Sequence, residues 1–181
     1  MRIIGGLYKR RLAEIPKWLP VRPTTERTRE ALAAILESRL DLNQTHALDM
    51  FSGTGMVTLD LVSCGVAQVT AVDKHPACIN CLKYNLNMLG IKMMPELIVS
   101  EALAFLSQTS QQYSFIYADP PYNWNGTITM LELIFSKKIL AANGLLILEH
   151  ATQAGFSFRR EFRSIRKYGT TALSIFIPLD Y

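Results

Sequence analysis

From residue 46 onward, short apolar runs alternate with longer segments in which apolar residues recur at helical spacing. The runs have the length of buried strands, and each intervening segment can carry an apolar stripe at positions i, i+3 and i+4. The runs are 47–51, 69–73, 97–99, 115–118, 145–148 and 172–177, and the segments between them are 57–64, 76–89, 101–108 and 127–140. This alternation predicts a parallel sheet with helices on both faces, because a crossover must join each pair of parallel strands.

The C-terminal part of the chain departs from this alternation. Residues 164–167 and 171–177 flank Tyr168-Gly169-Thr170, a pattern that is typical of a hairpin. The sequence therefore predicts an antiparallel edge on an otherwise parallel sheet of seven strands.

The N-terminal part predicts a small extension to this sheet. Pro23 and Thr24 mark the start of a helix, and residues 1–12 can form a small strand pair. We expect one α/β domain with a Rossmann-like fold, in which residues 1–40 form a basic hairpin and helix extension and residues 41–181 form the main unit.

The first apolar run continues into a glycine loop, in the stretch LDMFSGTG, which holds Asp49, Gly53 and Gly55. Glycines at a strand-to-helix turn let the backbone approach a ligand closely, and the helix N-terminus adds favourable N–H dipoles. A dinucleotide fingerprint would need glycine where Thr58 stands, so a nicotinamide cofactor is disfavoured. Asp49 can instead meet a cationic amino group.

Acidic residues end the next two strands. Asp73 follows the glycine loop by about twenty residues, where a carboxylate can accept hydrogen bonds from ribose hydroxyls or cap the helix that begins near Pro76. Glu101 can accept a hydrogen bond from an adenine amino group or act as a first-turn helix acid. These residues alone leave both alternatives open.

The fourth strand ends in Asp119-Pro120-Pro121-Tyr122. The prolines lack N–H groups and fix two φ angles, so the segment can continue neither a helix nor an inner strand. In an open α/β sheet the ligand crevice lies beyond the carboxyl ends of the strands. We expect the Asp119 carboxylate and the Pro120 carbonyl to hold a planar NH₂ group and align its lone pair with an electrophilic methyl group, with Tyr122 stacked on the base.

Charge is unevenly distributed along the 181 residues, whose net charge is +4. Residues 1–30 hold eight Lys or Arg against three acids, and residues 155–169 hold five against one. Two basic ends around a mildly acidic middle are typical of a surface that binds a polyanion, although solubilising surface charge would give the same counts.

The three cysteines are too few for a disulfide framework. Cys78 and Cys81 form a C-x-x-C after His75, but a second pair of ligands is missing, so we expect no metal and interpret both as buried or half-buried thiols. No stretch reaches the roughly 18 apolar residues of a membrane span, and the start of the chain lacks the features of a secretory signal. We therefore expect a cytoplasmic protein.

Together these residues resemble a class I S-adenosylmethionine-dependent methyltransferase. Asp49-x-Phe51-x-Gly53-x-Gly55 is similar to its cofactor motif, and Asp119-Pro120-Pro121-Tyr122 to the motif of enzymes that methylate amino groups of nucleobases. An ordered set of stretches resembles the RsmD family of bacterial 16S rRNA guanine-N2 methyltransferases over nearly the whole chain. The stretches are RIIGG at 2–6, RPTTERTRE at 22–30, LDMFSGTG at 48–55, LEH at 148–150 and KYGTT at 167–171.

The resemblance implies methyl transfer from S-adenosylmethionine to the N2 amine of one guanine in 16S rRNA, within an assembled or partly assembled 30S subunit. It implies no membrane and no obligate protein partner. The implied catalytic residues are Asp119, Pro120, Pro121 and Tyr122. The implied cofactor-binding residues are Thr24, Arg27, Asp49, Phe51, Gly53, Gly55, Asp73 and Glu101. The basic residues expected to bind RNA, mostly around one mouth of the active site, are Arg10, Arg11, Arg22, Arg159, Arg160 and Arg163.

The chain departs from the family pattern in two places. Family members usually have Glu at the position of Asp73 and Asp at that of Glu101, and both exchanges preserve charge. A glycine that usually interrupts the basic residues of the hairpin is absent from Lys9-Arg10-Arg11.

Two alternative functions use the same residues. A DNA adenine-N6 or cytosine-N4 methyltransferase could use Asp119-Pro120-Pro121-Tyr122, but so short a chain shows no target-recognition domain. A noncatalytic RNA-binding assembly factor could retain the fold, but it would not need an intact glycine loop and Asp119.

Overall fold

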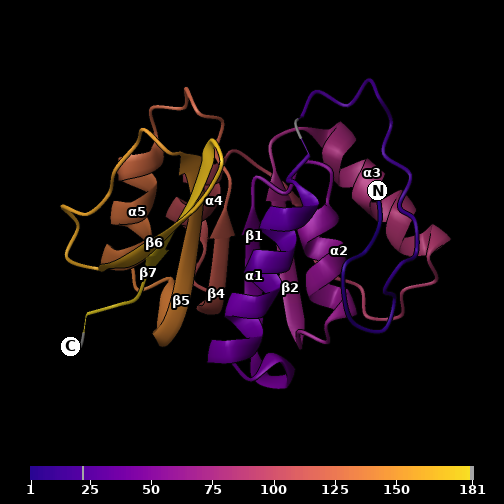
Figure 1. Cartoon of the computed structure of the whole chain (residues 1–181), viewed down its shortest axis with the longest axis horizontal. Coiled ribbons are helices and arrows are strands. Elements are labelled where there is room, and N and C mark those ends of the chain that lie inside the picture. Colours follow the sequence, from indigo (N-terminus) through magenta and orange to yellow (C-terminus); the bar gives the residue numbers. More distant parts are fainter. Residues whose placement is uncertain (22, 180–181) are drawn as a thin grey trace.

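Seven strands form one sheet in the computed structural model, which describes residues 1–21 and 23–179 (Figure 1). The strands lie in the order β3-β2-β1-β4-β5-β7-β6. Their bounds are β1 His46–Met50, β2 Gln68–Asp73, β3 Glu96–Val99, β4 Tyr113–Ala118, β5 Leu140–Ala151, β6 Phe162–Tyr168 and β7 Thr171–Phe176. The helices are α1 Glu26–Arg39, α2 Met56–Ser63, α3 Pro76–Met88, α4 Ala102–Gln108 and α5 Thr127–Ser136, with a short 3₁₀ turn at Leu42–Gln44.

The directions of the strands confirm the predicted sheet. β1 pairs in parallel with β2 and β4, and the parallel pairing continues outward to β3 and β5. β7 is antiparallel to both β5 and β6, which forms the expected C-terminal edge. The strand order reverses between β1 and β4. A ligand crevice is expected beyond the carboxyl ends of these two strands.

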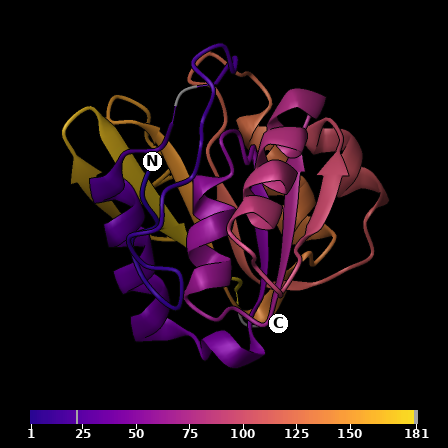
Figure 2. The same ribbon diagram turned by 90° about the vertical axis from the view of Figure 1, so that its right-hand side faces the viewer.

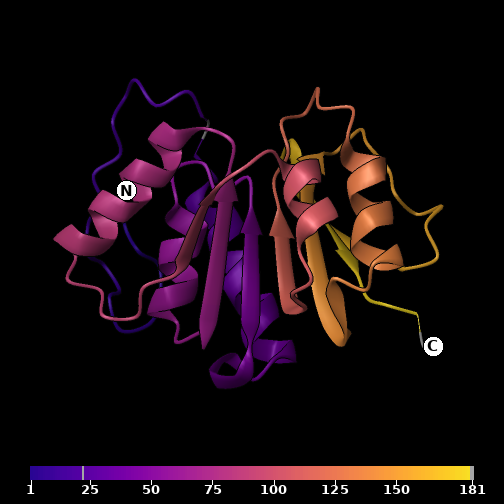
Figure 3. The same ribbon diagram turned by 180° about the vertical axis from the view of Figure 1, so that it is seen from behind.

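Two hydrophobic cores flank the sheet, one on each face. α1, α2 and α3 contribute Leu32, Leu59 and Leu82 to the first core, and α1 lies in front of the sheet in Figure 1. α4 and α5 contribute Leu106 and Ile134 to the second core, and Figure 3 shows both helices in front of the opposite face. Within the described ranges, no helix is long and apolar enough to cross a bilayer.

α1 begins two residues after the predicted start. The side chain of Thr25 caps the helix and accepts a hydrogen bond from the Thr28 N–H at 3.2 Å. The spacing of Leu32, Ile35, Leu36 and Leu40 predicts an inward stripe. The first three are buried on α1, and Leu40, just beyond the helix, is partly buried against the same core. Their burial joins α1 to the same core as α2 and the sheet.

β5 starts earlier than its apolar run predicts and replaces the end of the expected helix at 127–140. α5 ends at Ser136, and Lys138 then has a positive φ of 55°. That conformation ends a right-handed helix. Leu140 can therefore pair with Tyr113 at the start of β4.

The predicted N-terminal hairpin is reduced to one antiparallel bridge, between Arg2 and Leu12. The turn packs on the C-terminal end of α2 instead of extending a ladder. The Leu7 N–H donates to the Ser63 carbonyl at 2.8 Å. A Cβ on Gly6 would lie 1.8 Å from the same carbonyl oxygen. Hydrogen bonds to α2 therefore replace the bonds that a longer strand pair would make.

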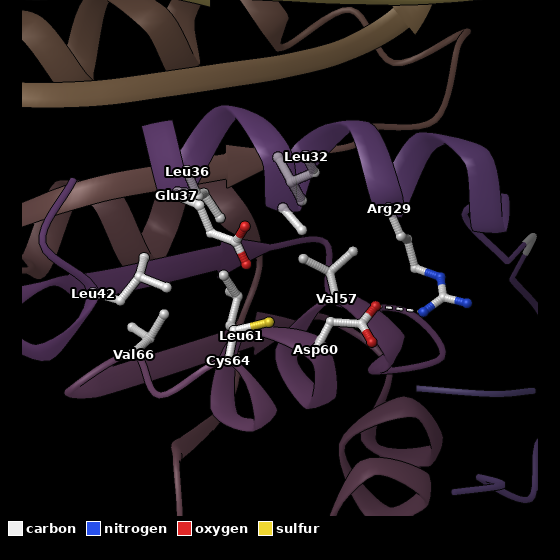
Figure 4. A pocket seen from close by; sticks show the side chains of 11 residues that line it. Arg29, Leu32, Leu36, Glu37, Leu42, Val57, Asp60, Leu61, Cys64 and Val66 are labelled. Carbon is white, nitrogen blue, oxygen red and sulfur yellow. Dashed lines mark hydrogen bonds and ion pairs between the residues drawn. The ribbon is translucent and has the colours of Figure 1, made fainter. Parts of the chain in front are cut away.

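A buried ion pair ties α1 to α2. The Arg29 guanidinium contacts the Asp60 carboxylate at the end of a small apolar pocket between the two helices (Figure 4). Arg29 also donates to the Arg2 carbonyl at 3.0 Å, and Asp60 accepts the Ile4 N–H at 3.0 Å. The pair therefore fixes the N-terminal segment as well as the two helices.

We expect Asp60→Ala to lower the free energy of unfolding by about 3–5 kcal/mol, because Arg29 would remain buried without its partner. Urea unfolding followed by circular dichroism measures this change. Glu30→Ala, at an exposed position of α1, is the matched control and should change stability by less than about 0.5 kcal/mol. Equal effects of the two substitutions would contradict the assigned role of the pair.

Candidate active site

The glycine loop and the Asp119-Pro120-Pro121-Tyr122 turn lie side by side at the carboxyl ends of β1 and β4. Asp49 pairs in register with Tyr117 on the neighbouring strand. The Asp119 N–H extends the ladder towards the Met50 carbonyl, at 3.5 Å. The rings of Phe51 and Trp124, which follow the two strands, contact each other with centroids 5.0 Å apart. The structure thus brings together the two motifs that the sequence places 70 residues apart.

The glycine loop requires unusual backbone conformations. Phe51 has a positive φ of 63°, and Gly53 and Gly55 have φ of 53° and 77°. A Cβ on Gly55 would lie 2.7 Å from the Leu82 side chain, so α3 leaves no room for a larger residue there. The loop therefore presents bare backbone at the N-terminus of α2, a place where a ligand can approach closely.

The segment before α1 covers this loop. The Val21 side chain lies 3.7 Å from the position of a Cβ on Gly53. Leu19 packs with Cys78 at the start of α3. In Figure 2 this indigo segment and the loop after β4 lie at the same end of the molecule. The N-terminal chain thus lies against the glycine loop at the end of the sheet where a ligand crevice is expected.

Asp49 carries an unpaired acceptor beneath the glycine loop. One carboxylate oxygen accepts the Thr58 hydroxyl at 2.6 Å, and the other is buried with no hydrogen-bond partner. Burial raises the pKa of Asp49 to about 7, although the bond from Thr58 acts in the opposite direction. A buried acceptor left without a partner fits an ammonium group brought by a ligand.

Asp73 and Glu101 lie at the carboxyl ends of neighbouring strands. Asp73 accepts the N–H groups of Gly53 and His75, both at 2.8 Å, and so holds the glycine loop to β2. Glu101 is exposed and lies 3.8 Å from Lys74 in an ion pair. Asp73 thus borders the crevice directly, whereas Glu101 lies at its open edge.

The turn after β4 holds Asp119 partly covered. Burial raises the pKa of Asp119 to about 8, and the charges of Glu149 and Asp49 act in the same direction. The Trp124 N–H donates to the Pro121 carbonyl at 2.8 Å and closes the turn. Asp119 is therefore mostly neutral at pH 7. Its carboxyl group can accept a proton only after a bound ligand or a higher pH has removed the proton that it carries.

Tyr122 extends from this turn to the hairpin of β6 and β7. Its hydroxyl lies 3.1 Å from that of Thr171, and the residue is 53% exposed. The Arg27 guanidinium lies over the ring of Tyr168, 5.7 Å from its centroid. Tyr168 and Thr171 pair across the hairpin. Tyr122 and Arg27 therefore both contact the hairpin of β6 and β7, and we call these residues the rim of the site.

Glu149 was not assigned a role from the sequence, although it stands in the quoted stretch LEH. It is 5% exposed, and its carboxylate accepts a hydrogen bond from the Tyr117 hydroxyl. Burial raises the pKa of Glu149. Its place two residues beyond Ile147, the partner of Tyr117, puts it on the same face of the sheet as Asp49 and Tyr117. Strand alternation was the signal that could have found it.

The basic residues predicted to bind RNA are spread over the molecule. The Arg11 guanidinium donates to the Leu89 carbonyl at 2.6 Å, at the C-terminal end of α3. This end of α3 lies at the amino ends of the strands, so Arg11, and Arg10 beside it, do not flank the crevice as expected. The reason is the docking of the N-terminal turn on the C-terminal end of α2.

The other predicted arginines fall into two groups. Arg159 lies 3.3 Å from Glu161 and 4.0 Å from Glu132 on α5, and is largely covered. Arg160 and Arg163 are exposed near the start of β6, away from its hairpin end. Arg22 lies outside the described residues. Arg27 and Thr24 were predicted to bind the cofactor: Arg27 lies at the rim over Tyr168, and Thr24 is half-buried.

Cys78 and Cys81 are both buried on α3, as free thiols. Burial raises the pKa of Cys78 to about 12, so this thiol stays protonated. No group of three His, Cys, Asp or Glu residues within the described chain is arranged to hold a metal ion.

Solved structures share the fold. A protein of Thermus thermophilus described as hypothetical matches with a TM-score of 0.85 and 24% identity, covering 99% of each chain. A ribosomal protein L11 methylase from Lactobacillus delbrueckii subsp. bulgaricus matches with a TM-score of 0.69 and 16% identity, covering 95% of this chain and 88% of that one. At these identities the likeness establishes the fold.

Sequence relatives establish the family. The family described as Conserved hypothetical protein 95 matches residues 1–177. Ribosomal RNA small subunit methyltransferase D of Haemophilus influenzae is 30% identical over 152 residues, which are 82% of this chain and 78% of that protein. The protein of the same name from Escherichia coli K12 is 28% identical over 155 residues, 86% and 77% of the two chains. The chain therefore belongs to the Conserved hypothetical protein 95 family, the RsmD family of methyltransferases that its sequence motifs predict.

Proposed function

We propose that this protein transfers the methyl group of S-adenosylmethionine to the N2 amine of one guanine in 16S rRNA, as part of an assembled or partly assembled small subunit in the cytoplasm. Membership of the family supports methyl transfer to rRNA. The observation that carries the proposal is the juxtaposition of Asp119 with the glycine loop and the unpaired oxygen of Asp49.

The donor side of the crevice suits S-adenosylmethionine. The unpaired Asp49 oxygen would accept a bond from the ammonium of the methionine end, beside the bare backbone of Gly53 and Gly55. Asp73 would receive the ribose hydroxyls, and Glu101 would face the adenine edge. When bound, the donor supplies a methyl group on a cationic sulfur, which a nucleophilic nitrogen can attack.

The acceptor side suits an exocyclic amine. The Asp119 carboxylate and the Pro120 carbonyl would each accept one N–H of the guanine N2 group, and Tyr122 would stack on the base. Holding both hydrogens withdraws the nitrogen lone pair from the ring and directs it at the methyl carbon. Both acceptors are fixed before the substrate arrives, so little reorganisation is needed at the moment of reaction.

The electrostatics of the crevice favour a cation. The charges of Glu149 and Asp49 both raise the pKa of Asp119. None of them takes part in an ion pair found within the described chain. The sulfonium and ammonium groups of the donor would supply the missing positive charge in a site partly shielded from water.

The rim is suited to structured RNA. Arg27 is exposed above the ring of Tyr168, and Arg166 and Lys167 on β6 are exposed beside it. These side chains can contact phosphate groups around the crevice. The guanine amine is paired or stacked within a helix, so the base would be extruded into the pocket to reach Asp119.

A labelled-donor assay tests the proposed function directly. We expect transfer of labelled methyl groups from S-adenosylmethionine to 16S rRNA, to small subunits that lack the modification, or to both, with all label recovered as N2-methylguanine after digestion. Label in adenine or cytosine of DNA would replace the proposal with a DNA methyltransferase. Binding of RNA with no label anywhere would favour a noncatalytic assembly factor.

Asp119→Ala should reduce turnover by at least about 100-fold, because the amine loses one of its two acceptors. Affinity for S-adenosylmethionine, measured by isothermal titration calorimetry, should stay within about three-fold. Asn123→Ala is the matched control, since Asn123 is exposed in the same loop, and it should retain turnover. A wild-type rate in Asp119→Ala would remove Asp119 from the mechanism.

Asp49→Asn should have opposite effects on binding and stability. Loss of the charged partner should weaken binding of S-adenosylmethionine by about ten-fold or more. The raised pKa of Asp49, about 7 against 3.8 in the unfolded chain, means that wild-type stability falls as the pH rises through this interval. The variant should therefore be more stable than the wild type at pH 8 in urea unfolding. Tighter donor binding, or lower stability at pH 8, would contradict this account of Asp49.

A further inference from the structure

Glu149 is a buried carboxylate that the proposed methyl transfer does not yet use. It is 5% exposed and accepts a hydrogen bond from the hydroxyl of Tyr117, which is 1% exposed. The pKa of Tyr117 is raised well above its usual value by burial, so its hydroxyl keeps its proton and remains a donor. The side chain of Glu149 is therefore held in one orientation beneath the crevice.

Strand geometry directs Glu149 and Asp119 to the same side of the sheet. Tyr117 pairs in register with Ile147 on β5. Glu149 lies two residues further along β5, and Asp119 lies two residues beyond Tyr117, directly after the last residue of β4. Alternate residues of an extended chain share a face. Of the charged neighbours of Asp119, Glu149 raises its pKa more than Asp49 does. The two residues directly follow Ala118 and Leu148, the last registered pair of β4 and β5, so we infer that their carboxylates are neighbours.

Within the described residues, neither of these two carboxylates is paired with a cation. The four ion pairs found in the described part of the chain involve other residues. The charges of Glu149 on β5 and Asp49 on β1 act on Asp119, and Asp73 on β2 and Asp60 on α2 act in turn on Asp49. The Tyr117 hydroxyl of β4 contacts Glu149, and Tyr122, Arg27 and Tyr168 lie near the hairpin of β6 and β7. Two neighbouring like charges with a shared environment cannot both ionise easily, so one proton is held between them.

Resting on the proposed methyl transfer, we propose that Glu149 and Asp119 form a proton-sharing pair that accepts the proton released by the guanine amine, with the Tyr117 hydroxyl holding Glu149 in place. In this step the N2 lone pair forms the bond to the methyl carbon. The carbon–sulfur bond breaks, and its electron pair stays on sulfur as a neutral thioether. The proton leaves N2 for the Asp119 carboxylate, and the pair later releases it to water.

Glu149 acts in this scheme through Asp119 and does not touch the base, so it is a positioning residue. Its negative charge makes Asp119 a stronger base than an isolated aspartate. A proton that leaves the amine therefore meets an acceptor whose affinity for it is matched to neutral pH. This arrangement differs from a purely structural Glu149, whose removal would change stability without moving the pH dependence of the reaction.

The test is the pH profile of kcat/KM with Glu149→Gln, in which the amide oxygen can still accept the Tyr117 hydroxyl. We expect the acid limb of the wild-type profile to lie near pH 8, the pKa of Asp119. In Glu149→Gln the acid limb should move down by about one pH unit or more. Glu132→Gln, on α5 beside Arg159, is the matched control and should leave the profile unchanged. A folded Glu149→Gln with the wild-type profile would overturn the pair.

A second variant covers the case in which Glu149→Gln does not fold. Tyr117→Phe keeps the buried ring and removes the hydrogen bond that supports the Glu149 charge, so its acid limb should also move down. An unchanged limb in folded Tyr117→Phe would equally overturn the pair.

The unliganded protein gives an independent measurement. The pKa of Asp119, about 8 against 3.8 in the unfolded chain, makes the folded state lose stability as the pH rises through this interval, and Glu149→Gln should reduce this loss in urea unfolding. Product analysis of the wild type separates the two proposals. Absence of N2-methylguanine would reject the proposed function, whereas N2-methylguanine with unshifted profiles would reject the pair alone.

Discussion

The burial of three carboxylates that form no ion pair with any described residue is the constraint on which this structure depends. Asp49, Asp119 and Glu149 lie at the ends of β1, β4 and β5, where burial raises the pKa of each. Every unit by which a pKa is raised corresponds to about 1.4 kcal/mol that the charged form costs the folded protein. The two apolar cores and the buried Arg29–Asp60 pair stabilise the fold against this cost. The result is a negative crevice that suits a cationic methyl donor.

The topology of the sheet explains why these groups meet. Reversal of the strand order puts β1 beside β4, so that the glycine loop and the Asp119 turn leave the sheet at adjacent points. Alternation along β4 and β5 then places Tyr117, Asp119 and Glu149 on one face. A helix layer on that face, with α1 and the segment before it, covers the cluster and leaves the rim open near Tyr168.

Much of this was predictable because the signals are local in sequence. Apolar periodicity identified the strands and helices, and the Asp119 turn and glycine loop were located by the strands they follow. The predicted N-terminal hairpin was too long. Its backbone forms hydrogen bonds with the end of α2 instead, and no local sequence pattern indicates these contacts. A count of charged residues does not show where their side chains lie in the fold. It therefore could not indicate that Arg10 and Arg11 lie away from the carboxyl ends of the strands. Alternation along β5 can assign Glu149 to one face of its strand. The places of Glu149 and of the unpaired Asp49 oxygen in the site also depend on which strands are neighbours, and only the three-dimensional structure shows this.

Carbon-13 NMR titration of the aspartate side-chain carboxyl groups, in the unliganded wild-type protein, tests the central claim most directly. The account predicts that Asp49 titrates near pH 7 and Asp119 near pH 8. Titration of both groups near their ordinary value of about 4 would show carboxylates that are hydrated or paired with cations, and would contradict the account.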